Sequence, residues 1–301
     1  MKNVRIACVG GVNEKESKAE LTRRISLVLP DQPDLIILPE LCDRVGTSAW
    51  YNEQSSWGVP DYIRDIARNH HCYIAFPTQT RRDNIRRNSI LMVDRQGNIM
   101  GEYAKVNPTI GEMEITGCSA GREPVVFDCD FGRVGCAICF DLCFQELAWQ
   151  YREMNPDLMI FCSMYHGGFM QQWWAYTILA HFAFATPSPV TPSGVINPVG
   201  ETVAHTTNYY SYVTANVNLD CRVTFLGLNA GKLQAAKEKY GNKIRISDPG
   251  FVGAVALYSE TDEFTAQDIF DEFEIEPVRT YFDRVRQVRK EHLEPLPGKE
   301  Q

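Results

Sequence analysis

Three cysteines lie within eight positions of the segment GRVGCAICFDLCFQE, at Cys136, Cys139 and Cys143. Sulfurs at this spacing could be metal ligands, a redox pair, core residues or a nucleophile, and the spacing alone does not choose among them. Cys139 differs because it follows an apolar strand predicted at VGCAI and precedes a turn toward a predicted helix at 145–154. A cysteine at such a turn can present its sulfur to a cleft, where backbone N–H groups favour the thiolate. Cys136 is expected in the core.

Two charged residues also end predicted strands. Glu40 closes the apolar run LIILPE, where a carboxylate is either half-exposed or fixed at the carboxyl edge of a sheet, the usual place of α/β sites. Lys105 ends the second strand of a hairpin predicted at 88–105. A lysine there is usually solvated, and it gains a chemical role only beside a carboxylate and an electrophile. Three such residues at three strand ends predict one site at a sheet edge.

The elements that position these residues alternate along the chain. Short apolar runs, such as 4–10 and 156–162, are separated by amphipathic segments of helical length, such as 14–29 and 61–70. No linker or repeat interrupts residues 1–220, so we predict a single α/β domain there, with strands pairing in hairpins and across helices. Residues 221–301 lack this pattern and are predicted to be a C-terminal extension, packed on the domain or on a partner subunit.

The composition excludes some classes of partner. The 301 residues carry a formal net charge of −8, which argues against a nucleic-acid or anionic-membrane surface. The one basic cluster, RRDNIRR at 81–87, is short and broken by Asp83, as in a solvated loop. No run approaches the roughly 18 apolar residues of a membrane span. The N-terminus turns polar early, without a secretory pattern, so the ten cysteines are expected to be reduced thiols of a cytoplasmic protein.

Three stretches of the chain resemble the signature regions of a known family. LIILPE, EYAKV and VGCAICFD look like the three motifs of the nitrilase superfamily, the carbon–nitrogen hydrolases, in the same order. Three further stretches are similar in order and spacing: NSILMVDRQGNIMGEY, GREPVVFDCDFGRVG and SGVINPVGETVA. The likeness covers roughly residues 3 to 219. One motif would be weak support, whereas three in order are strong.

The resemblance implies a four-layer αββα sandwich and a Glu–Lys–Cys triad, carried here by Glu40, Lys105 and Cys139. Glu40 would act as general base, and Cys139 would form a covalent thioester or thioimidate. Lys105, with the backbone N–H of Phe140, would stabilise the oxyanion. No metal or other cofactor is implied.

Many family members carry a second active-site glutamate after the lysine. Glu114 lies seven residues before Gly121, which fits the usual spacing to a glycine, and we favour it on that basis. Glu112 lies seven residues after Lys105 and fits the spacing of some nitrilases instead.

The chain departs from the family pattern beside the nucleophile. Cys143 and Gln145 stand where arginine and proline are common, so a bidentate guanidinium for a free carboxylate is missing. A substrate with a free carboxylate is therefore less expected. The aromatic segment CSMYHGGFMQQWW is predicted to line the pocket through Tyr165, His166 and Trp173, although Trp173 fits a core or subunit interface equally well.

Other interpretations of the cysteines fit less well. A zinc site lacks a second clustered pair of ligands, and a redox C-x-x-C lacks a thioredoxin-like context. A Cys–His hydrolase using His166 or His181 leaves Glu40 and Lys105 unexplained. We therefore expect a hydrolase that cleaves a small-molecule amide or carbamoyl bond and releases ammonia. A nitrilase and an inactive member serving as a binding module are the alternatives, and the assembly is expected to be a homodimer or larger.

Overall fold

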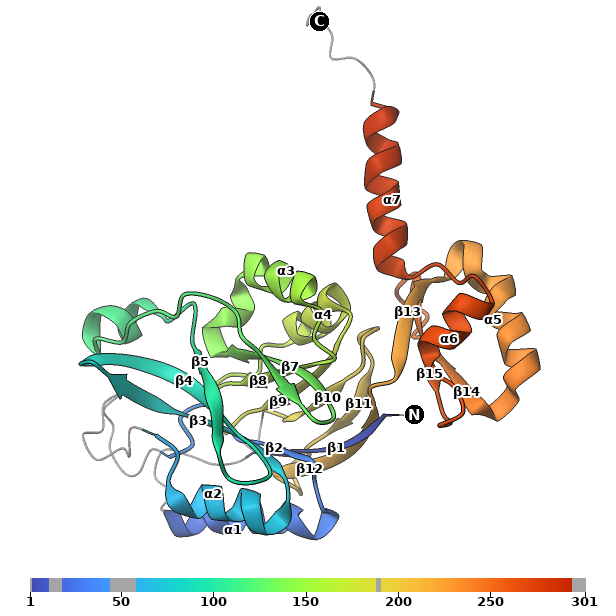
Figure 1. Ribbon diagram of the computed structural model, residues 1–301. Helices are drawn as coiled ribbons and strands as arrows, with labels where there is room; N and C mark the ends of the chain where they lie inside the picture. Colours follow the sequence, from blue (N-terminus) through green and yellow to red (C-terminus); the bar gives the residue numbers. More distant parts are fainter. Residues whose placement is uncertain (1, 11–17, 44–57, 188–190, 294–301) are drawn as a thin grey trace, which may run out of the picture. The chain divides into compact units, whose positions relative to one another are not determined.

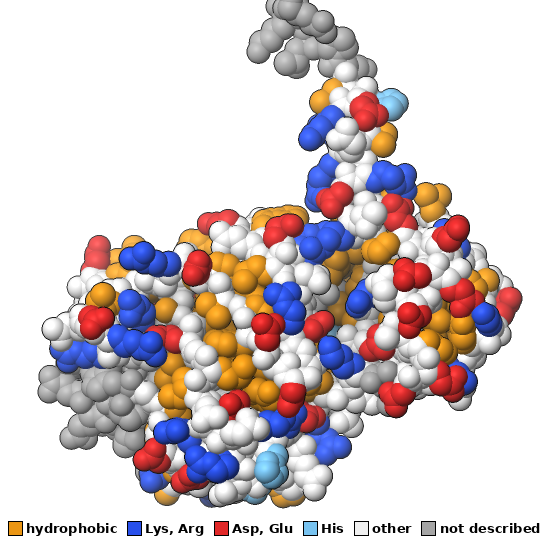
Figure 2. Space-filling model, in the orientation of Figure 1, with side chains coloured by type: hydrophobic (Ala, Val, Ile, Leu, Met, Phe, Trp, Pro, Cys, Tyr) orange, Lys and Arg blue, Asp and Glu red, His pale blue; other side chains and the backbone are white. Residues whose placement is uncertain are grey.

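The computed structural model describes residues 2–10, 18–43, 58–187 and 191–293. The chain divides into two compact units, Lys2–Leu219 and Asp220–Gln301, each of which is described by itself (Figure 1). The first residues of the helix predicted at 14–29 lie outside the described residues. Figure 2 shows acidic and basic side chains intermixed over one face, with apolar side chains between them.

The first unit contains two six-stranded sheets. The first sheet has the spatial order β12 (Tyr212–Asn218), β1 (Asn3–Val9), β2 (Leu35–Ile37), β3 (Tyr73–Arg82), β4 (Ile85–Val93) and β5 (Ile99–Ala104). The second has the order β11 (Thr202–His205), β10 (Gly194–Ile196), β9 (His181–Ala185), β8 (Leu158–Cys162), β7 (Gly132–Ile138) and β6 (Val126–Cys129). Strands β1, β2 and β3 are parallel, as are β7, β8 and β9, and the outer strands are antiparallel to their neighbours.

Side chains alternate between the two faces of each sheet. In β1, Ile6 and Cys8 enter the core between the sheets, whereas Ala7 and Val9 pack beneath helices α1 (Lys18–Val28) and α2 (Asp61–His70). In β7, Cys136 and Ile138 enter the same inter-sheet core, and Ala137 packs toward α3 (Gln145–Met154) and α4 (Phe169–Ile178). The layers are therefore helix, sheet, sheet and helix, which confirms the predicted αββα sandwich (Figure 1).

The strand directions bring the predicted site residues to one edge of the first sheet. Glu40 follows β2, which is parallel to β3. Strand β4 is antiparallel to β3 and β5 is antiparallel to β4, so β5 runs in the direction of β2. Lys105 follows β5 and therefore leaves the sheet at the same edge as Glu40.

The second unit has a sheet and a core of its own. Strands β13 (Cys221–Phe225), β15 (Ala254–Ser259) and β14 (Ile244–Ser247) pair antiparallel in that order, with helices α5 (Leu226–Tyr240), α6 (Ala266–Glu272) and α7 (Val278–Glu291). Leu233, Val255, Leu257 and Phe270 are among its buried residues. The sequence pattern of residues 221–301 did not predict this sheet and core, because the strands are four to six residues long and bounded by polar and glycine-containing turns. Their packing on the domain or on a partner stays a prediction.

Candidate active site

Cys139 stands at a sharp turn at the carboxyl end of β7. It begins the short 3₁₀ helix η3 (Cys139–Cys143), and its backbone is in the left-handed region with φ of 48°. That conformation is uncommon for a residue with a side chain and is held only when the surrounding structure enforces it. The side chain of Cys139 packs against the core between the two sheets. The turn therefore carries the sulfur to the edge where Glu40 and Lys105 leave the first sheet.

The carboxylate of Asp141 holds this turn in place. It accepts hydrogen bonds from the backbone N–H of Ile138 at 2.9 Å and from the hydroxyl of Tyr103 at 2.6 Å. It also accepts from the backbone and side-chain nitrogens of Asn107, at 2.7 and 3.2 Å. Tyr103 lies in β5 of the first sheet, so this fully buried carboxylate joins the two sheets beside Cys139. The sequence reasoning assigned it no role, although an acid two residues after the candidate nucleophile was a usable signal.

A buried cluster of two carboxylates and one ammonium group lies at this edge. The Nζ atom of Lys105 is 3.1 Å from Oε1 of Glu40 and 2.8 Å from Oε2 of Glu112. Lys105, Glu40 and Glu112 are at most 3% exposed. Each carboxylate accepts one backbone N–H, from Met164 to Glu40 at 3.0 Å and from Thr109 to Glu112 at 2.8 Å. These contacts compensate for the burial of three charges.

The second glutamate of the cluster is Glu112, whereas Glu114 is exposed. Both belong to the π-helical turn η2 (Gly111–Ile115), in which residues two positions apart point in different directions. The structure therefore places Glu112, the alternative given by the spacing of seven residues after Lys105, in the cluster and leaves the favoured Glu114 outside it. The spacing to Gly121 was a poor guide. The backbone N–H of Gly121 bonds the carbonyl of Lys105, and this contact does not depend on which glutamate faces the lysine.

The thiol of Cys139 is neutral at rest. Burial, followed by the negative charge of Glu40, raises its pKa to about 12. Lys105 and hydrogen bonds from Ser163 and Met164 lower the pKa only in part. The backbone N–H of Met164 favours the thiolate, as expected, but burial and the adjacent carboxylate outweigh it.

Lys105 and Glu112 are held in their charged forms. Burial lowers the pKa of Lys105, but Glu40, Cys139 and Glu112 together raise it above its usual value. Burial raises the pKa of Glu112, but the charge of Lys105 lowers it below its usual value. A protonated lysine thus faces a neutral thiol and an ionised carboxylate.

The other two clustered cysteines lie in different surroundings. Cys136 is fully buried in the core between the sheets, as the sequence predicts. Cys143 is exposed, with its sulfur 3.7 Å from the hydroxyl of Tyr165. His181, one of the bases of the Cys–His alternative, begins β9, whereas Cys139 follows the last residue of the parallel strand β7. His181 therefore lies at the opposite edge of the sheet from Cys139.

Two of the four predicted pocket residues lie beside the cluster. Phe140 is half-buried with its ring edge against Phe144, and it directly follows Cys139. Tyr165 follows Met164, whose N–H bonds Glu40. Burial and Cys143 are the main causes that raise the pKa of the Tyr165 hydroxyl, and the charges of Cys139 and Glu40 contribute further.

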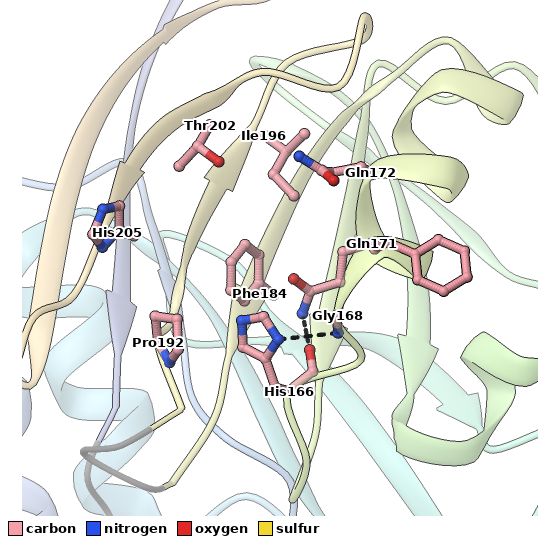
Figure 3. A pocket seen from close by; sticks show the side chains of 10 residues that line it. His166, Gly168, Gln171, Gln172, Phe184, Pro192, Ile196, Thr202 and His205 are labelled. Carbon is pink, nitrogen blue, oxygen red and sulfur yellow. Dashed lines mark hydrogen bonds between the residues drawn. The ribbon is translucent and has the colours of Figure 1, made fainter.

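His166 and Trp173 lie on the helix-covered side of the second sheet. Trp173 packs half-buried against the core beneath α3 and α4, which is the core alternative given above. His166 lines a separate pocket of about 370 Å³ with Phe184, Ile196 and His205, shown in Figure 3. Phe184 belongs to the core on the helix side, whereas Cys139 packs on the opposite face of the sheet. The structure therefore does not bring these two residues to the cluster.

Two general findings concern the described residues alone. They contain no group of three or more His, Cys, Asp and Glu side chains arranged to hold a metal ion. Among the helices of residues 2–10, 18–43, 58–187 and 191–293, none has the length and apolar character to cross a membrane.

Comparison with known proteins gives a consistent family. The sequence matches the carbon-nitrogen hydrolase family over residues 6–216. It is 30% identical over 137 residues to the chloroplastic omega-amidase of Arabidopsis thaliana, covering 39% of this chain and 37% of that protein. It is 24% identical over 169 residues to a probable nitrilase of Schizosaccharomyces pombe, covering 53% and 61%. The chain thus spans less than two thirds of the length of these relatives.

The fold is also found in solved structures. The structure of XC1258 from Xanthomonas campestris, described as a CN-hydrolase superfamily protein with an arsenic adduct in the active site, superimposes with a TM-score of 0.62. The identity is 20%, and the alignment covers 80% of this chain and 96% of that one. Because the family match runs from residue 6 to residue 216 and includes all three strand ends, this chain belongs to the carbon–nitrogen hydrolase family.

Proposed function

We propose that this hydrolase cleaves the carbon–nitrogen bond of a small-molecule amide or carbamoyl compound and releases ammonia, with Cys139 as nucleophile. The observation that carries the proposal is the 3.1 Å contact between Lys105 and Glu40, buried at the edge where β7 delivers Cys139. The relative named omega-amidase supports an amide over a nitrile. The relative named probable nitrilase makes a nitrile the second candidate.

The first step joins the sulfur to the substrate. Because the thiol is neutral, Glu40 takes the thiol proton as the sulfur attacks the carbonyl carbon. The carbonyl electrons move onto the oxygen, which becomes an oxyanion. Lys105 is protonated, and its Nζ contacts Oε1 of Glu40 and both carboxylate oxygens of Glu112. In this proposal one of the N–H groups directed at Glu112 turns to the oxyanion. The backbone N–H of Phe140 is the second oxyanion donor in this proposal.

The second half of the reaction releases ammonia and restores the thiol. The oxyanion collapses, the carbon–nitrogen bond breaks, and the proton held by Glu40 passes to the leaving nitrogen. Glu40 then removes a proton from water, which attacks the thioester. The carbon–sulfur bond breaks, the carboxylic acid leaves, and the sulfur takes the proton back. Glu112 keeps Lys105 protonated and in place throughout.

The residues beside the nucleophile favour an uncharged substrate. Cys143 occupies the position where arginine is common, and its nearest polar contact is the hydroxyl of Tyr165. A thiol and a phenol offer neutral hydrogen bonding and no bidentate cation for a free carboxylate. We therefore place an amide without a nearby carboxylate first among the substrates to be tested.

The nucleophile is tested by ammonia release from a panel of amides, carbamoyl compounds and nitriles. We expect Cys139→Ala to abolish release, because no other group can form the covalent intermediate. Cys136→Ala and Cys143→Ala, which change a core sulfur and an exposed sulfur, should keep substantial activity. Equal loss in Cys136→Ala at unchanged folding would reject the assignment, and a wild-type protein inert toward the whole panel would favour the binding-module alternative.

The second glutamate is tested by a matched pair of variants. Glu112→Gln removes a charge that keeps Lys105 protonated, so turnover should fall by roughly 10²-fold, as when an oxyanion donor is impaired. Glu114→Gln changes an exposed carboxylate two residues away and should leave turnover within about twofold. Steady-state kinetics on the same substrate measure both, and the reverse order of effects would restore Glu114 to the site.

The protonation of the nucleophile is tested by ultraviolet absorbance of the thiolate, taken as the difference between wild type and Cys139→Ala. Because burial and Glu40 raise the pKa of Cys139 to about 12, the proton is held well above neutral pH. We expect no thiolate step between about pH 6 and about pH 9, where an ordinary cysteine is already half ionised near 8.5. A step below about pH 8 would show a preformed thiolate and remove the need for Glu40 as base.

The assembly of the chain is also proposed. We infer a homodimer or larger oligomer in which residues 221–301 of one chain pack on a neighbouring subunit. Light scattering at micromolar concentration should give a mass at least twice that of one chain. A monomeric mass would contradict this inference and leave the catalytic assignment untouched.

A further inference from the structure

One uncharged residue contacts all three charged residues of the buried cluster. Asn88 lies in β4 and is 2% exposed. Its side-chain nitrogen donates to Oε1 of Glu40 at 2.7 Å and to Oε1 of Glu112 at 2.8 Å. Its backbone carbonyl accepts the N–H of Lys105 at 2.8 Å.

The place of Asn88 in the sheet explains these contacts. Strands β2 and β5, which precede Glu40 and Lys105, are separated by β3 and β4. At a strand spacing of about 4.8 Å, the two strands are about 14 Å apart. The charged side chains must therefore reach across the sheet edge to meet, and Asn88 projects from one of the strands between them. Its amide fills the span between the two carboxylates.

The orientation of the amide is fixed by its partners. Both are carboxylate oxygens, which accept hydrogen bonds, so the NH₂ group must face them and Oδ1 must face away. Oδ1 is buried and has no hydrogen-bond partner among the described residues. A buried acceptor without a partner costs stability. Fold stability alone therefore does not explain an asparagine at this position.

We propose that Asn88 is a positioning residue that holds Glu40 in place to accept the thiol proton and favours the charged form of Glu112. The proposal rests on the function proposed above. Two carboxylates share one ammonium group, so the cluster carries one net negative charge, which Glu40 uses when it takes the proton. A lysine at position 88 would neutralise that charge and an aspartate would add another. An amide supplies a donor to each carboxylate and changes neither.

The charges around the cluster agree with this role. Burial raises the pKa of Glu112, and Lys105 and then Asn88 lower it, with the net result below its usual value. The other titratable groups that interact with these charges are Cys118, Cys139, Cys162, Tyr165 and Asp141. The pKa values of the three thiols and of the tyrosine hydroxyl are all raised, so these four groups stay neutral at pH 7. The loss of activity on the acidic side of a pH profile therefore reports the protonation of carboxylates.

The test compares the pH profile of kcat/KM for wild type and Asn88→Ala. Without the hydrogen bonds from Asn88, a carboxylate is protonated more easily. As the pH is lowered, the variant should therefore lose activity at a higher pH than wild type. We expect the acidic limb to move up by about one pH unit, equivalent to a tenfold change in ionisation. Asn197→Ala is the control, because Asn197 is also buried and donates to Glu201 at 2.7 Å, in the turn between β10 and β11. Its acidic limb should coincide with that of wild type.

A second readout does not require a substrate. The rate at which iodoacetamide alkylates Cys139, followed by mass spectrometry, depends on Glu40 as proton acceptor and should show the same upward move in Asn88→Ala. If wild type hydrolyses nothing in the panel but the alkylation limb moves, the proposed function fails while the role of Asn88 stands. If hydrolysis is confirmed but both limbs coincide with wild type, the role of Asn88 is overturned.

The position of a limb on the pH axis does not depend on the fraction of active protein, so partial misfolding does not hide the effect. If Asn88→Ala does not fold, Asn88→Ser replaces it. A serine hydroxyl can donate to only one of the two carboxylates, so its limb should lie between those of wild type and a full loss. A uniform loss of rate at every pH, with an unmoved limb, would show a merely structural role and overturn the proposal.

Discussion

The active-site edge depends on the burial of Lys105 between two carboxylates. Three charges that are at most 3% exposed are tolerable inside a protein only when each is paired and hydrogen-bonded. Lys105 supplies the pairing, and Asn88, Met164 and Thr109 supply the remaining donors. Every element that ends at this edge is constrained by that requirement, because a displaced strand would leave a buried charge without its partner.

A second constraint joins the two sheets beside the nucleophile. Tyr103 and Lys105 are two residues apart at the end of β5, and Asp141 and Cys139 are two residues apart at the end of β7. The hydrogen bond from Tyr103 to Asp141 crosses between the sheets, so it fixes the distance between the lysine strand and the nucleophile turn. The left-handed backbone of Cys139 is held by the same carboxylate through Ile138. The contacts of Asp141 thus hold the strained turn at Cys139 and also link it to the strand that carries Lys105.

The charges around Cys139 favour a neutral thiol in the resting protein, and the proposed mechanism removes its proton only during attack. With its pKa raised to about 12, Cys139 rests as a neutral thiol in spite of the ammonium group nearby. The negative charge of Glu40 disfavours the thiolate. In the proposed mechanism the same carboxylate removes the thiol proton during attack. In the proposed mechanism, the nucleophile is generated only when a substrate carbonyl is present to receive it, which limits side reactions of a partly exposed sulfur.

The sequence by itself determined the strand ends that carry chemistry and the layered fold around them. Apolar runs followed by Glu40, Lys105 and Cys139 are local patterns, and the nearly continuous apolar runs of β1 and β7 are typical of strands buried on both faces. The four-layer arrangement followed from the family resemblance. Only the tertiary structure decided between Glu112 and Glu114, separated His166 from the cluster, and brought Asn88 and Asp141 into it. These outcomes depend on which way a side chain points from a turn and on contacts between residues 24 to 48 positions apart in the chain. The protonation state of Cys139 could not be predicted from the sequence either, because burial of the thiol and the closeness of Glu40 arise only when the two sheets pack together.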